Sequence, residues 1–323
     1  MYAVGRRLPF GFFLLSLLLW HPPAPLAAEE IVRVAVPLFP TPAFPQMLAA
    51  DRGLFAKRGL RVEFIRINSE PTTYQALVYG DVQATSGAPV GLVLSHLQGV
   101  DVVAVGSWLN IVPYTIVTRE RISDLSQLRG KKIGVNRLGG RSALIVRVMM
   151  EDAGLDFTRD LTILQLGGSG ERLAALISGG IDAGPVEATL EPKLVSLGLH
   201  ILRAKRAPFA TAPTVVKRSY LQSHRPTMKR FMEAYLEAMQ FIRHNKEDTL
   251  RTLARVLGSN DRQVLDYAYD DILGTMEPSL VPPQEAVNNL LKMVAYTDKR
   301  ATSVRPAEIL DLSLLDELKS QAK

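Results

Sequence analysis

The sequence predicts an α/β protein built from two similar lobes, and two observations support this fold class. Short aliphatic segments alternate with helical segments along the chain, which is the pattern of parallel strands joined by crossover helices. In addition, residues 76–84 and 175–183 share one pattern, in which an Ala-Leu-aliphatic helix end runs through glycine into a short strand. Glycine just after a helix is typical of a left-handed C-cap, so each segment is expected to form a helix end, a turn and a strand.

The repeat extends outward from these two segments. Three further pairs recur in the same order, at offsets of 99 to 101 residues: 32–36 with 131–135, 51–54 with 152–155, and 62–65 with 162–165. Unrelated α/β units also resemble one another because they obey the same physics, and the two-lobe prediction holds under either explanation.

The composition is that of a globular protein and narrows the possible functions. The chain has 323 residues, 47% hydrophobic and 22% charged, which is enough for two domains of ordinary size. The absence of cysteine excludes disulfides, thiol catalysis, Cys-ligated zinc and a lipidated N-terminal cysteine. Beyond the N-terminal segment, the densest basic cluster is Arg203, Lys205 and Arg206; it lacks interleaved aromatic residues, so no nucleic-acid partner is expected.

Residues 1–28 have the features of a secretory signal. Arg6 and Arg7 precede an apolar run at 8–20 that is too short to span a bilayer, and an Ala-rich segment ends at Ala27-Ala28. The small-residue rule for cleavage is poorly met, so the cleavage position near Ala27-Ala28 stays open, with an uncleaved anchor as the alternative. We expect a periplasmic or extracellular protein.

The first lobe is expected to alternate strands and helices. Aliphatic and β-branched runs predict strands at 31–36, 61–67, 82–85 and 100–106, and helices are expected at 46–51, from Thr72 or Thr73 to 79, and at 90–98. The run at 100–106 is continuously apolar, as expected for a strand buried in a parallel sheet. The second lobe repeats the plan, with strands at 114–118, 131–135, 162–166, 181–183 and 200–202 and helices at 143–153, 171–178 and up to about 197.

The C-terminal part reads as a last strand at 214–217 followed by helices from Arg225 onward. One apolar stripe at three- and four-residue steps predicts core packing rather than a methionine-rich binding face; its members are Met228, Phe231, Met232, Tyr235, Met239 and Ile242. We therefore expect a signal at 1–28, a discontinuous lobe I at 29–112 and 217–323, and lobe II at 113–216. The hinge segments are placed near 106–118 and 209–217.

Ligands of open α/β sheets bind beyond the C-terminal ends of the strands. The loops expected at those ends are 39–44, 86–89, 136–142 and 184–187, with 107–110 at the hinge. The loop that opens with Asn136 is the strongest candidate for an anion site. Gly140 allows a close approach to the backbone, and Arg141 and Ser142 stand at a helix start that favours an anion. The alternative is that Ser142 only caps the helix and that Arg141 is a solvated charge.

The other loops supply further candidates. Ser86 and Gly87 offer a hydroxyl and backbone amides as donors. Phe39 and Trp108 either wall an apolar or planar ligand or belong to the core. Glu187 either binds an ammonium or a heterocyclic N–H, or stabilises a helix N-terminus. Catalytic and metal constellations are weak: the histidines lack metal-ligand spacing and no Gly-x-Ser-x-Gly motif occurs, so no enzyme, cofactor or metal is expected.

Three stretches carry a family resemblance: 48–55 (Leu-Ala-Ala-Asp-Arg-Gly-Leu-Phe), 76–84, and 124–135, which ends Leu-Arg-Gly-Lys-Lys-Ile-Gly-Val. They resemble the ABC-transporter solute-binding proteins for nitrate, sulfonates, taurine and thiamine precursors (NMT1/THI5-like), over residues 31–242. The resemblance implies a type II periplasmic-binding-protein fold, a Venus flytrap with a hinge between its lobes. It also implies a cleft lined by Thr41, Ser86-Gly87, Asn136 to Ser142 and Val186-Glu187, with ABC permease and ATPase subunits as partners. A monomer is expected.

The expected function is that of an extracytoplasmic solute-binding protein of an ABC importer that captures a small organic anion, sulfonate-, nitrate- or taurine-like. A pyrimidine, thiamine-precursor or other heterocyclic ligand is the alternative. From other classes, a periplasmic-binding-fold enzyme such as a lyase, or a ligand sensor, remains open. The fungal thiamine-pyrimidine synthases of this fold rely on a cysteine-rich motif that this chain lacks.

Overall fold

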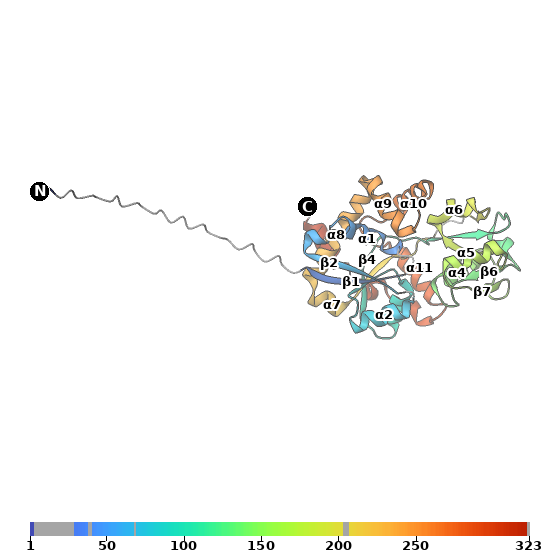
Figure 1. Cartoon of the computed structure of the whole chain (residues 1–323). Coiled ribbons are helices and arrows are strands. Elements are labelled where there is room, and N and C mark those ends of the chain that lie inside the picture. The colour runs from blue at the N-terminus through green and yellow to red at the C-terminus, as the bar shows by residue number, and fades with distance from the viewer. Residues whose placement is uncertain (3–28, 38–40, 68, 203–206, 322–323) are drawn as a thin grey trace.

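The computed structural model describes residues 1–2, 29–37, 41–67, 69–202 and 207–321. The predicted signal from residue 3 onward, Phe39, and the basic cluster at 203–206 lie outside the described residues. The described chain forms two lobes, with α4, α5 and α6 on one side of the molecule and most other labelled helices on the other (Figure 1). No helix among the described residues is both long and apolar enough to cross a bilayer.

Each lobe is built on a five-stranded mixed sheet. Lobe I has the order β2-β1-β3-β10-β4, and lobe II has the order β7-β6-β8-β5-β9. In lobe I, β1 is parallel to β2 and β3, and β10 is antiparallel to β3 and β4. In lobe II, β6 is parallel to β7 and β8, and β5 is antiparallel to β8 and β9. The two sheets thus share one plan, which confirms the predicted α/β fold of two similar lobes.

All ten expected strands are present, with shifts at their ends. Their bounds are β1 Glu30–Val36, β2 Leu60–Arg66, β3 Ala84–Ser86, β4 Val102–Ser107, β5 Tyr114–Thr118, β6 Lys132–Val135, β7 Thr162–Gln165, β8 Ala183–Glu187, β9 His200–Leu202 and β10 Pro213–Lys217. The prediction was wrong at 184–187, which is strand rather than loop. The reason is that β5 supplies antiparallel partners along that segment, so Tyr114 pairs with Glu187 and Thr115 with Val186.

The helices flank the two sheets. Their bounds are α1 Phe44–Asp51, α2 Glu70–Tyr79, α3 Pro89–Leu97, α4 Arg141–Asp152, α5 Ser169–Ser178, α6 Glu191–Ser196, α7 Arg218–Ser223, α8 Arg225–His244, α9 Lys246–Leu257, α10 Arg262–Thr275, α11 Gln284–Val294, α12 Pro306–Ile309 and α13 Ser313–Gln321. In the internal repeat, α2 and α5 both end at a left-handed glycine, Gly80 with φ of 86° and Gly179 with φ of 84°. The C-cap prediction is therefore confirmed in both lobes.

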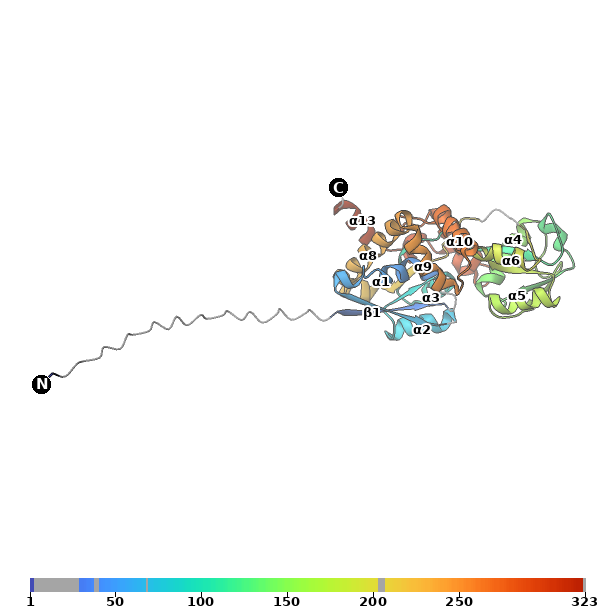
Figure 2. The ribbon, with the colours of Figure 1, turned by 45° about the horizontal axis from the view of Figure 1, so that its top comes forward.

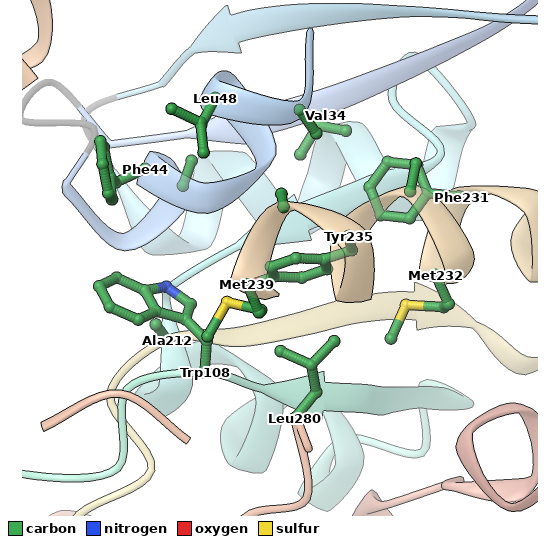
Figure 3. Packing of buried hydrophobic residues seen from close by; sticks show 14 of the residues in the cluster. Val34, Phe44, Leu48, Trp108, Ala212, Phe231, Met232, Tyr235, Met239 and Leu280 are labelled. Carbon is green, nitrogen blue, oxygen red and sulfur yellow. The ribbon is translucent and has the colours of Figure 1, made fainter. Parts of the chain in front are cut away.

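The apolar stripe of α8 forms the centre of the lobe I core. All six predicted residues of the stripe are fully buried. Figure 3 shows Tyr235 and Met239 between the side chains of α1 and those of Trp108 and Leu280. Each large apolar side chain buried in this way contributes about 1.5–3 kcal/mol relative to exposure.

The chain crosses between the lobes twice, along two antiparallel segments. Phe209 N–H donates to Asn110 O (2.9 Å), and Val112 N–H donates to Ala207 O (3.0 Å). After the second crossing, β10 joins the first sheet, so the predicted lobe boundary at residue 216 falls inside this strand. Pairing with β3 and β4 places the strand in lobe I, because sheet partners rather than chain order define a lobe.

The C-terminal helices of lobe I also touch lobe II. Tyr267 of α10 donates to Glu191 Oε2 of α6 (2.7 Å), and the guanidinium of Arg147 on α4 lies 4.4 Å from the Tyr296 ring just beyond α11. Figure 2 shows α10 beside the junction of the two lobes. The lobes are thus connected by the hinge and by helix contacts beside the cleft.

Candidate functional site

A cleft of about 860 Å³ lies between the lobes and is lined by residues of both. Seven of the predicted site residues line it: Thr41, Ser86, Asn136, Gly140, Arg141, Ser142 and Glu187. Ser86 and Glu187 are the last residues of β3 and β8, and the other five follow the C-terminal ends of β1 and β6, as the rule for open α/β sheets predicts. The sheet plan therefore brings together side chains that are up to 146 residues apart in sequence (187 − 41).

The loop between β6 and α4 is held by its own side chains. Ser142 Oγ donates to Asn136 Oδ1 (2.8 Å) and accepts from Asn136 N–H (3.0 Å), and the side chain of Ser142 is buried. A Cβ at Gly140 would lie 2.7 Å from the Asn136 amide, so a side chain there would displace that amide. Ser142 therefore fixes the loop rather than capping the helix, and α4 begins with no side-chain cap.

Arg141 brings a positive charge to the cleft at the start of α4. Its Nη2 donates to the Tyr114 hydroxyl (3.2 Å), and its guanidinium lies 5.7 Å from the Tyr114 ring. Burial opposes the charge, but Tyr114, Glu70 and Glu187 outweigh burial and hold the pKa of Arg141 above its ordinary value. The cleft therefore contains a permanent cation with two acidic groups near it.

Three predicted site residues do not line the cleft. Trp108 is fully buried in the lobe I core, where Nε1 donates to Pro42 O (2.7 Å). Val186 is fully buried in the lobe II core. Gly87 has φ of 89° and donates its N–H to Pro213 O (2.9 Å). Trp108 and Ser86 both donate to the Pro42 carbonyl, so Trp108 supports the cleft wall at Pro42 from behind.

Two residues that are prominent in the cleft, Arg172 and Glu70, were not predicted as site residues from the sequence. Arg172 is buried and donates to Pro185 O (3.0 Å), Gly167 O (2.7 Å) and Ser169 Oγ (2.6 Å), so it braces the loop after β7 against β8. Glu70 accepts from Gly91 N–H (2.8 Å) and lies in the field of Arg141. In sequence, an arginine within a helix and an acid at a helix start both look like ordinary surface residues.

Two acceptor atoms in the cleft wall lack hydrogen-bond partners. Glu187 Oε2 and Thr189 Oγ1 are buried, and within the described part of the chain neither has a hydrogen-bond partner. Buried polar atoms are usually paired, so these two acceptors are exceptions in the wall of the cleft.

The fold and the cleft define a class of protein, the two-lobe proteins with the periplasmic-binding-protein fold. A structure of a protein from Bordetella bronchiseptica matches with a TM-score of 0.75 at 19% identity, covering 91% of this chain and 98% of that chain. The periplasmic aliphatic sulphonate binding protein SsuA from Escherichia coli matches with a TM-score of 0.67 at 18% identity, covering 88% and 91%. The periplasmic nitrate-binding protein NrtA from Synechocystis matches with a TM-score of 0.67 at 13% identity, covering 91% and 89%.

The family follows from a second comparison. The family profile described as NMT1/THI5 like matches residues 41–249, and the chain belongs to this family. A comparison with curated protein sequences found no match.

Proposed function

We propose that this protein is an extracytoplasmic solute-binding protein of an ABC importer, and that it captures a small organic anion between its lobes. The observation that supports this most directly is Arg141, a permanently charged side chain in the interlobe cleft at the start of α4. Free N–H groups and the dipole at a helix start favour an anion in the same place. Asn136, fixed by Ser142, adds an amide donor beside it.

Binding between two lobes couples ligand capture to closure. Only the closed arrangement gives the ligand contacts from both lobes, so the ligand shifts the population toward that arrangement. An importer permease then receives the closed complex. The fold neighbours that bind sulphonate and nitrate support this proposal by analogy.

A heterocyclic ligand is the second candidate. Glu187 Oε2 and Thr189 Oγ1 are unpaired acceptors that suit an N–H donor, and Tyr74 and Tyr114 supply aromatic rings to the cleft. An enzyme on the same fold, such as a lyase, is the candidate from another class, and a measurement of turnover tests it. A sensor without a transport role differs in its partners rather than in its cleft.

A ligand screen tests the proposed function. The purified protein is heated with ethanesulfonate, taurine, nitrate, acetate or an aminopyrimidine, and the products are analysed for turnover. We expect at least one anion to raise the melting temperature without being converted. Arg141→Ala should weaken the binding of that anion by at least about tenfold, because a charge-assisted contact is lost. Arg159→Ala is the control: Arg159 is exposed and paired with Asp156, so its loss should leave the affinity for the anion unchanged. Stabilisation by the pyrimidine alone would favour the second candidate, and turnover would contradict the proposal.

A further inference from the structure

The N-terminus of α3 in lobe I is occupied by a side chain of the protein itself. Pro89 at the helix start has no N–H, so the first donors of α3 are those of Val90 and Gly91. Gly91 N–H donates to Glu70 Oε2 at 2.8 Å, and the Val90 amide also favours the charged carboxylate. The helix start that faces the cleft from lobe I is therefore already bound to an anion.

The surrounding residues hold Glu70 in this position. One turn further along α2, the Tyr74 hydroxyl donates to Ala88 O (3.0 Å), which ties α2 to the turn before α3. A Cβ at Gly91 would lie 2.4 Å from the Tyr74 ring, so the close approach of α2 to α3 requires glycine at this position. The Glu70 contact thus belongs to a packed junction of two helices.

The charges of the cleft lining also disfavour a second anionic group beside Glu70. Among the described lining residues, three arginines (137, 141 and 172) face four acids (Glu70, Glu171, Glu187 and Asp271), a formal charge of −1 (3 − 4). Arg172 is engaged with two carbonyls and a hydroxyl. A ligand with two anionic ends would place one of them beside Glu70, where like charges repel.

We propose that Glu70 is a specificity-determining residue that fills the α3 N-terminus in place of a ligand anion. It confines the anionic group of a ligand to the lobe II wall at Arg141, and the other end of the ligand must be neutral or an N–H donor. The statement about the ligand rests on the proposed function, whereas the occupation of the α3 N-terminus does not.

Inorganic sulfate tests the occupation without knowledge of the ligand. Glu70→Ala exposes the Val90 and Gly91 N–H groups, whereas Glu70→Gln removes the charge but keeps an amide oxygen that accepts from Gly91. We expect sulfate to bind Glu70→Ala at least about tenfold tighter than wild type by calorimetry, and Glu70→Gln to remain within about threefold of wild type. Glu285→Ala, at the exposed start of α11, is the charge-matched control and should leave sulfate binding unchanged.

Equal sulfate binding by wild type and Glu70→Ala would overturn the inference, as would an equal gain in Glu70→Gln, because charge alone would then explain the effect. Circular dichroism checks that the variants fold. If Glu70→Ala does not, Glu70→Ser replaces it and leaves the same N–H groups open.

Binding of mono- and disulfonates tests the role of Glu70 in specificity independently of the proposed function. Wild type should prefer ethanesulfonate to 1,2-ethanedisulfonate, and Glu70→Ala should shift that affinity ratio toward the disulfonate by at least about tenfold. If wild type binds the monosulfonate and the ratio does not shift, Glu70 does not set specificity, although the proposed function stands. If no sulfonate binds any variant but sulfate binding rises in Glu70→Ala, the occupation of α3 stands and an anionic sulfonate ligand is rejected.

Discussion

Side chains at the cleft divide into those that face the ligand space and those that hold other groups in place. Sequence reasoning found Arg141, Asn136 and Glu187 because they follow strand ends, and the structure places all three at the cleft. The same reasoning also predicted Trp108 and Ser142 as ligand-binding residues. In the structure, Trp108 donates to the Pro42 carbonyl and Ser142 donates to the Asn136 amide oxygen. Hydrogen-bond partners distant in sequence decide between these roles, and no local pattern reports them.

Thr189 offers a direct test of an unpaired acceptor. Its hydroxyl is buried without a hydrogen-bond partner among the described residues, so Thr189→Val should leave the free energy of unfolding unchanged within about 0.5 kcal/mol, or raise it. Affinity for the physiological ligand should fall, because the ligand then loses an acceptor. Thr118→Val is the control: its buried hydroxyl donates to Glu120 O (2.8 Å), so its loss should cost about 1 kcal/mol. Urea unfolding and calorimetry measure both, and a destabilised Thr189→Val would contradict the assignment.

The pH dependence of stability should show the effect of burying Glu70. Burial raises the pKa of Glu70. This effect of burial is larger than the opposing effects of Arg141 and of the Gly91 N–H. The folded protein then keeps this proton to higher pH than the unfolded chain does, so the free energy of unfolding falls as pH rises through that interval. Glu70→Gln lacks this contribution. The difference in unfolding free energy, variant minus wild type, should therefore rise from acid to neutral pH in urea titrations; a flat difference would argue against a raised pKa.

At the scale of elements, the sequence predicted the fold well because local signals and tertiary partners agree. Aliphatic runs located all ten strands, and glycine located the ends of α2 and α5. It failed at 184–187, where two residues that look like a turn, Gly184 and Pro185, form part of β8. Their strand conformation depends on pairing with β5, which lies about 70 residues earlier in the chain and is invisible to a local pattern.

The paired glycine caps give a prediction for the elements of the repeat. Gly80 has φ of 86°, and a Cβ there would meet no atom within 4 Å, so Gly80→Ala introduces backbone strain without a clash. We expect a loss of about 1–2 kcal/mol in the free energy of unfolding. Gly274→Ala in α10 is the matched control, because space is equally open there but φ is not positive, and it should be neutral or stabilising by up to about 1 kcal/mol. Equal effects of the two variants in thermal unfolding would refute the strain argument.

For the whole molecule, the sheets alone do not determine how the lobes meet. The sequence placed the hinge near 106–118 and 209–217, and the paired crossover segments lie there. The contacts of α10 and α11 with lobe II were not predicted, because they join helices whose polar faces look solvent-exposed in sequence. These contacts stabilise the observed arrangement of the lobes and so affect the population that binds a ligand.

The hydrogen bond between Tyr267 and Glu191 allows a direct test of whether contacts between the lobes affect ligand binding. It joins α10 of lobe I to α6 of lobe II at 2.7 Å. Tyr267→Phe removes the hydroxyl with little change in packing, so it should favour more open arrangements of the lobes. We therefore expect a larger radius of gyration for the ligand-free protein and ligand binding weakened by about two- to tenfold. Tyr269→Phe is the control, because the Tyr269 hydroxyl donates to Ile242 O (2.9 Å) inside lobe I; it should lower stability while leaving the radius of gyration unchanged. Small-angle X-ray scattering and calorimetry distinguish the two variants. If both leave the radius of gyration and the affinity unchanged, closure depends on the hinge and the ligand rather than on the contact between α10 and α6.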